Sequence, residues 1–172
     1  MIDPQIPVAD LAQRFVPFAI IFGIAAALRK RQAIGGWLMF FYYQVYAGAL
    51  FSVILLTRTY RLYTLRPWSN ETRHILFVVA SVPRLVGFLI VTTVATILLV
   101  RRDLQWLERL RFAFAIELLF MTISLAIDFV YFRNALQVNF GHFAVFVAWF
   151  GYFHGSQRVH HVFVTHDWPP AA

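Results

Sequence analysis

The stretch SVPRLVGFLIVTTVATILLV, from Ser81 to Val100, decides the fold class of this chain. Its residues are apolar throughout except for small polar side chains and one arginine, Arg84. A helix of about 20 apolar residues crosses the roughly 30 Å hydrocarbon core of a bilayer. The stretch therefore predicts a membrane-spanning helix, in which the charge of Arg84 must be stabilised by some other group.

The composition of the whole chain is that of an integral membrane protein. Of its 172 residues, 60% are hydrophobic and 13% are charged, whereas soluble domains have about 25% charged residues. The mean hydropathy is +0.67. The chain has no cysteine, which excludes disulfides, thiolate zinc sites and iron–sulfur ligation. We expect one membrane domain with short loops.

Four apolar runs predict an all-α integral membrane protein built on a bundle of four transmembrane helices. The connection Arg133–Asn134 is so short that the last two helices must form an antiparallel hairpin. The domain is expected at 34–164, followed by a C-terminal tail at 165–172. The expected helices are 34–56, 75–100, 112–132 and 135–153.

The N-terminal segment 1–33 contains a further apolar run at 11–28. Basic residues follow this run at 29–31 instead of preceding it, which is the reverse of a signal peptide. Small residues at four-residue spacing favour a helix that packs closely on a neighbour, and these are Ala19, Gly23 and Ala27. We expect a fifth spanning helix here, with an interfacial or re-entrant helix as the alternative.

The net charge of +7 comes from arginines at the ends of apolar runs. This placement indicates membrane topology and contact with anionic lipid headgroups, not nucleic acid. Lysine and arginine are in excess on the side that carries 29–31 and the segment 101–111, so this side is predicted to be cytoplasmic. The C-terminus falls on the same side.

Four ionisable residues lie within the predicted spans, namely Arg84, Glu117, Asp128 and His142. Placing such groups in hydrocarbon costs free energy, so each is expected to pair with another group or to have a direct function. Depth along the helices makes Asp128 the natural partner of Arg84, with His142 as a third member. The network is predicted to be a polar pin that fixes helix register, and a proton or ion relay is the alternative. An arginine that faces a partner subunit is a further alternative.

No motif for catalysis is present in the sequence, so the protein is not expected to be an enzyme and no cofactor is predicted. His142 is a candidate axial ligand for haem or a chlorophyll-type pigment. The plainer alternative is a histidine that is hydrogen-bonded to Asp128 or to a backbone carbonyl. The histidines of the C-terminal tail match no zinc signature.

Two motifs resemble a known family. AIGGWL at Ala33–Leu38 opens a span, and VAWFGYFHGSQRVHHVFV at Val147–Val164 closes the last one. Both are similar to the YdgK-like inner-membrane proteins of bacteria, a family without a settled activity. The resemblance implies a four-helix domain in the bacterial inner (cytoplasmic) membrane, although Gln157 departs from its pattern. The matching residues are Gly35, Gly36, Trp37, Asp128, Trp149, Tyr152, Ser156, Arg158 and Val159.

Pairs of small residues recur in the predicted helices and favour close packing between helices, within the chain or between chains. They are Gly48/Ser52, Ala144/Ala148 and Gly151/Gly155. The predicted function is that of a non-catalytic accessory subunit in a larger respiratory or photosynthetic membrane complex, with lipids and other membrane subunits as partners. The alternative is a small transporter or ion-conducting protein that uses Arg84, Asp128 and His142.

Overall fold

The computed structural model describes residues 36–65 and 71–167. The predicted N-terminal helix at 11–28 lies outside the described residues, together with its packing positions and Gly35. Five α-helices and a final π-helical turn make up the described chain. They are α2 (Trp37–Leu65), α3 (Glu71–Arg101), α4 (Leu104–Tyr131), α5 (Arg133–Gly155), α6 (Gln157–His160) and η2 (His161–Thr165).

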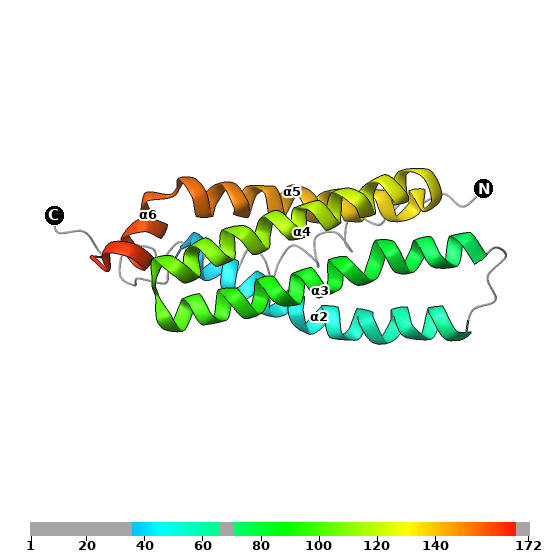
Figure 1. Ribbon diagram of the computed structural model, residues 1–172, viewed down its shortest axis with the longest axis horizontal. Coiled ribbons are helices and arrows are strands. Elements are labelled where there is room, and N and C mark those ends of the chain that lie inside the picture. Colours follow the sequence, from blue (N-terminus) through cyan, green and yellow to red (C-terminus); the bar gives the residue numbers. More distant parts are fainter. Residues whose placement is uncertain (1–35, 66–70, 168–172) are drawn as a thin grey trace, which may run out of the picture.

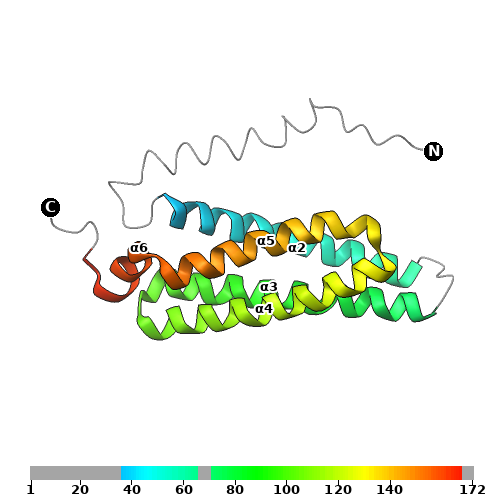
Figure 2. The same cartoon turned by 90° about the horizontal axis from the view of Figure 1, so that it is seen from above.

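Helices α2 to α5 run up and down along one common axis and form an elongated bundle (Figures 1 and 2). The packing is most extensive between α3 and α4, followed by α4 with α5 and α2 with α3. Short α6 and η2 lie at the end of the bundle where α3 turns into α4 (Figure 1). The predicted all-α fold is confirmed.

Two of the described helices, α3 and α4, are long and apolar enough to cross a membrane. Helix α3 contains the Ser81–Val100 stretch and also Pro83, which leaves the helix unbroken. Only 22% and 33% of the most apolar windows of α3 and α4 are buried inside the bundle, so most of this apolar surface is not covered by the rest of the described chain. A largely unburied apolar helix is the pattern of a lipid-facing span.

All four long helices extend beyond the predicted apolar runs, and α2 and α4 do so by about two turns. Helix α2 continues past Leu56 to Leu65, and α4 begins at Leu104 instead of Phe112. Apolar character marks the part of a helix that fits in hydrocarbon, whereas the helix itself continues as long as its backbone bonds are made and the residues favour helix. The added turns carry arginine, leucine and glutamate, which are good helix formers.

The turns between the helices have local causes in the sequence. Arg102 adopts a left-handed backbone conformation with φ of 51°, and the Asp103 side chain then caps α4 by accepting a 2.8 Å hydrogen bond from the Trp106 amide. Between α4 and α5 only Phe132 lies outside a helix. The predicted antiparallel hairpin of the last two helices is confirmed, and its turn lies one residue before Arg133–Asn134.

The core at one end of the bundle is aromatic. Phe41 of α2, Phe114 of α4 and Phe153 of α5 are fully buried. The ring centroids of Phe41 and Phe153 are 4.7 Å apart, and those of Phe114 and Phe153 are 5.7 Å apart. Trp149 also contacts Phe41, with a centroid distance of 5.2 Å. Aromatic pairs of this kind add about 0.5–1.5 kcal/mol beyond their buried area, so this cluster joins α2, α4 and α5.

The C-terminal segment closes this aromatic end. Val162 and Phe163 are buried in the same core. The carboxylate of Asp167 accepts hydrogen bonds from the hydroxyl of Thr165 and from Nδ1 of His161. The bonds from Thr165 and His161 hold the pKa of the Asp167 carboxyl below its usual range. The chain therefore remains structured beyond Val164, into the segment that the sequence assigns to a tail.

Truncating Phe153 tests the aromatic core. We expect Phe153→Ala to lower the free energy of unfolding by about 3–5 kcal/mol, because a fully buried ring is lost from a packed cluster. The matched control is Phe140→Ala on the same helix, where the ring is 61% exposed and the change should cost less than about 1 kcal/mol. Unfolding in mixed micelles measures both, and equal losses would contradict this core.

Candidate functional site

Arg84 lies on α3, partly buried in the bundle. Its predicted direct ion pair with Asp128 is not formed. In residues 36–65 and 71–167 the oppositely charged side chains within 4.0 Å are Glu108–Arg111 and His161–Asp167. The interaction of Arg84 with the carboxylates is longer in range, as the charges of both Asp128 and Glu117 act on its guanidinium.

Asp128 has a different direct partner. The side chain is buried, with 3% exposed, and its Oδ2 accepts a 2.5 Å hydrogen bond from Nδ2 of Asn139 on α5. Asp128 lies four residues before Phe132 and Asn139 seven residues after it, so the antiparallel hairpin brings both residues near the same end of the bundle. In the sequence, Asn139 stands out only as one of the polar residues that interrupt the apolar run at 135–153. The side-chain amide of Asn139 within an apolar run, near the same end of the hairpin as Asp128, was the feature of the sequence that could have predicted this pair.

Glu117 is the most enclosed charged residue in the described chain. Its side chain is 0% exposed, and neither carboxylate oxygen has a hydrogen-bond partner. The carboxylate lies against Gly87 of α3, where an added Cβ would collide with Oε2. Gly87 is one helical turn beyond Arg84. The missing side chain of Gly87 thus makes the space in which the Glu117 carboxylate is held.

Polar groups from three helices lie inside the bundle, and we call them the interior cluster: Arg84, Gly87, Glu117, Asp128 and Asn139. The Arg84 charge acts on Glu117 and also on His142, although His142 itself lies on the exposed side of α5. Burying two carboxylates without an opposing charge costs several kcal/mol. Arg84 supplies that charge from α3, so the cluster favours one alignment of α3 with α4.

The small residues divide into two groups. Gly48 lies against Phe88, whose Cζ is 2.6 Å from the position of an added Cβ, and Ser52 is buried. The other group lines one exposed side of α5, and among described residues nothing comes within 4 Å of a Cβ added at its glycines. We call it the small-residue face of α5: Gly141, Ala144, Ala148, Gly151 and Gly155.

The two family-like motifs come together in space. Gly36 has a left-handed φ of 58° and precedes α2, which places Trp37 edge-on to Trp149 of α5 at a centroid distance of 6.2 Å. The indole Nε1 of Trp149 donates a 2.8 Å hydrogen bond to Gln44 of α2. These contacts hold α2 to α5. Of the remaining motif residues, Tyr152 packs on Trp149, Ser156 caps α6, Val159 is buried and Arg158 lies in α6.

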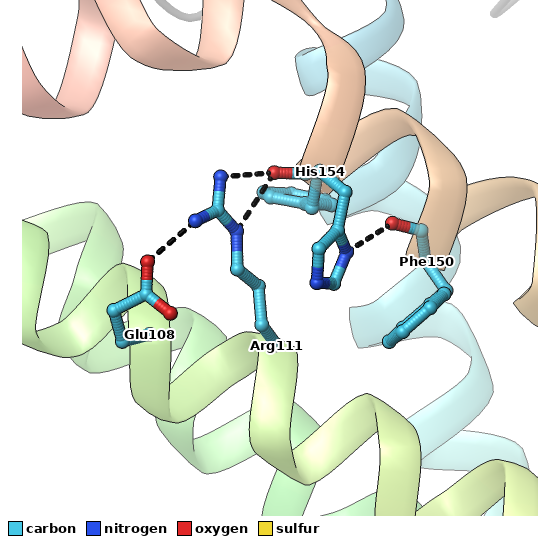
Figure 3. Close-up of polar contacts among 5 residues, drawn as sticks. Glu108, Arg111, Phe150 and His154 are labelled. Atoms are coloured by element: carbon cyan, nitrogen blue, oxygen red, sulfur yellow. Dashed lines mark hydrogen bonds and ion pairs between the residues drawn. The ribbon is translucent and has the colours of Figure 1, made fainter.

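Arg111 joins the start of α4 to the end of α5 (Figure 3). Its Nε and Nη2 donate to the carbonyl oxygen of Phe153 at 3.0 and 2.8 Å, and Nη1 pairs with Glu108 at 2.5 Å. Carbonyls in the last turn of a helix lack partners within the helix, so the guanidinium satisfies one of them. His154 beside it donates from Nδ1 to the carbonyl of Phe150. In the sequence, Arg111 is evident only as one of the basic residues that indicate the orientation in the membrane.

No protein-family model, curated protein or solved structure matches the chain. The resemblance to the YdgK-like proteins therefore stays a prediction. Within residues 36–65 and 71–167, no group of three or more His, Asp or Glu side chains is arranged to hold a metal ion.

The contact between Gly87 and Glu117 can be tested by a double-mutant cycle. We expect Gly87→Ala to destabilise the protein by about 1–3 kcal/mol, because the new methyl group displaces the carboxylate. In a Glu117→Ala background the same change should cost much less, since the colliding group is gone.

The control for this cycle is Gly151→Ala. It makes the same substitution in an exposed helical position with nothing within 4 Å, where alanine should be neutral or stabilise by about 0.5–1 kcal/mol. Unfolding free energies in detergent measure all variants. If the losses in unfolding free energy from the changes at positions 87 and 117 are additive, the two side chains are not in contact.

Proposed function

We propose that the chain is a multi-pass protein of the bacterial inner membrane in which α2 and α5 cross the bilayer beside α3 and α4. What supports this is the shared axis of the four helices (Figure 2) and their lengths. The shortest, α5, has 23 residues, or about 35 Å at 1.5 Å per residue, which covers a hydrocarbon core of roughly 30 Å. The arginines at the α3–α4 turn put this end and the C-terminus in the cytoplasm.

We further propose that the protein is a non-catalytic accessory subunit of a larger membrane complex, with respiratory and photosynthetic complexes as the hosts. The observation that carries this proposal is the small-residue face of α5. Only Phe146, Trp149 and Phe153 of this helix are buried, so its opposite side is available to a neighbour. In a bilayer, helices associate through close van der Waals packing, which small residues permit.

The interior cluster supports a structural role. The Asn139–Asp128 hydrogen bond and the fit of Glu117 on Gly87 each join two helices of the bundle. The Arg111–Phe153 contact does the same at the cytoplasmic end. Polar contacts of this kind fix the register of helices that would otherwise slide along apolar surfaces.

The test is isolation of the protein from its native membrane in mild detergent. Mass spectrometry and an absorption spectrum then identify what accompanies it. We expect a stoichiometric complex with larger membrane subunits. A monodisperse chain that carries no other protein would contradict the accessory role.

Enlarging the small-residue face should separate the subunit from its host. In Ala144→Leu/Ala148→Leu the added side chains prevent close helix approach, and we expect at least a tenfold loss of co-purifying partner. The control is Ala126→Leu at an exposed position on α4, which should keep the complex. Thermal unfolding of the isolated chain should be unchanged in both, because these positions are exposed. An intact complex in the double variant would place the partner elsewhere.

A second candidate function is conduction of protons or ions through the interior cluster, and the enclosed Glu117 favours it. Arg84 and Asp128 lie close enough for their charges to act within the same cluster. Intramembrane carboxylates with a nearby cation recur in proton pathways.

Neutral variants distinguish conduction from a structural role. If the cluster conducts, Glu117→Gln and Asp128→Asn should abolish a pH-driven flux in proteoliposomes while the protein remains folded. If it is structural, the wild-type protein shows no flux, and Asp128→Asn lowers the unfolding free energy by about 1–3 kcal/mol as its bond to Asn139 weakens. Flux and unfolding are measured on the same preparations.

A further inference from the structure

Three arginines lie at or near the turn between α3 and α4, and two of them lie over the ring of one tryptophan. The guanidinium carbon of Arg109 lies 4.3 Å from the centroid of the Trp106 ring, and that of Arg101 lies 5.7 Å away. Arg102 lies between them in the turn, with its Nε 3.4 Å from the carbonyl oxygen of Leu99. All three arginines are exposed, whereas Trp106 is half-buried. We call Arg101, Arg102, Trp106 and Arg109 the arginine–tryptophan patch.

The positive charge of this patch is not neutralised by the protein. Within the described residues, none of its three arginines has a carboxylate within 4.0 Å. Of the two nearby acidic residues, Glu108 is paired with Arg111. The other, Asp103, uses its carboxylate to cap α4 at the Trp106 amide. Three guanidinium groups against one capping carboxylate leave the patch cationic.

Stacking on Trp106 gives two of these cations a defined position. A guanidinium over an indole face gains about 0.5–1 kcal/mol at an exposed site. Both Arg101 and Arg109 are exposed, so their N–H donors can reach a ligand. Such planar donors match the oxygens of a phosphate group and bind it in bidentate fashion.

Apolar side chains flank the same patch. Val100 and Leu104, which border the turn on either side, are 78% and 51% exposed. The turn also connects the two helices that are long and apolar enough to cross a membrane, so it lies where hydrocarbon gives way to headgroups. A ligand that fits here carries an anionic phosphate beside apolar chains. A soluble phosphate or a nucleotide would leave Val100 and Leu104 uncovered.

We propose that the arginine–tryptophan patch binds an anionic glycerophospholipid, with the phosphate between Arg101 and Arg109 and the acyl chains along Val100 and Leu104. In the orientation given above, this lipid belongs to the cytoplasmic leaflet, whose anionic lipids attract basic residues. The site does not depend on a partner subunit. It can therefore be tested on the isolated chain, and its outcome is independent of the accessory role.

The experiment compares lipid retention by the purified protein in detergent, with phosphatidylglycerol and phosphatidylcholine as probes and native mass spectrometry as the measurement. Wild-type protein should retain phosphatidylglycerol in preference to phosphatidylcholine. Arg101→Gln/Arg109→Gln should lower the affinity for phosphatidylglycerol by about tenfold or more. The control is Arg73→Gln/Arg133→Gln, which removes the same charge from exposed positions at the opposite end of the bundle and should leave retention unchanged.

Two single variants separate geometry from charge. Arg109→Lys keeps the charge but loses the planar stack on Trp106, and it should weaken phosphatidylglycerol binding by a few-fold. Trp106→Leu removes the stacking surface for both arginines and should have a similar effect. Equal retention by the patch variant and the opposite-end control would overturn the proposal, as would equal retention of the two lipids by wild type. Displacement of the lipid by millimolar inorganic phosphate would also overturn it, by assigning the patch to a soluble anion.

Discussion

The contact on which this bundle depends is the placement of the Glu117 carboxylate against Gly87. It lies in the α3–α4 interface, which is the most extensive in the bundle. A buried carboxyl group without hydrogen-bond donors is tolerated where it is neutral or has a cation nearby, and where space is available for it. Arg84 provides the charge and Gly87 provides the space, both from α3, one turn apart. The two helices are thereby aligned both lengthwise and in rotation.

Once α3 and α4 are aligned, the rest of the bundle follows. The hairpin at Phe132 places α5 antiparallel to α4, and the Asn139–Asp128 bond sets its level. At the other end, Arg111 holds the last turn of α5 and the aromatic cluster joins it to α2. The polar contacts set register and the rings fill the space between helices. Both classes of contact are needed. Apolar surfaces alone would allow one helix to shift along another, and polar contacts alone would leave the space between the helices unfilled.

The two outer surfaces of the bundle suit different neighbours. The small-residue face of α5 has no charge and little side-chain volume, which suits the close approach of another helix. The arginine–tryptophan patch has charge and exposed apolar side chains at a membrane boundary, which suits a lipid. In the proposed accessory role, one surface would hold a neighbouring subunit and the other a lipid, and the two lie on different elements of this chain.

The sequence by itself determined the all-α class, the apolar stretches of α3 and α4, and the antiparallel hairpin, because length, hydropathy and a one-residue turn are properties of contiguous residues. It also singled out Arg84, Glu117, Asp128 and His142 as ionisable residues within the apolar helices. Only the tertiary structure decided that Asp128 bonds Asn139, that Glu117 rests on Gly87, and that Ala144 and Ala148 face outward. These depend on the rotation of each helix about its axis, and packing against the neighbouring helices sets that rotation.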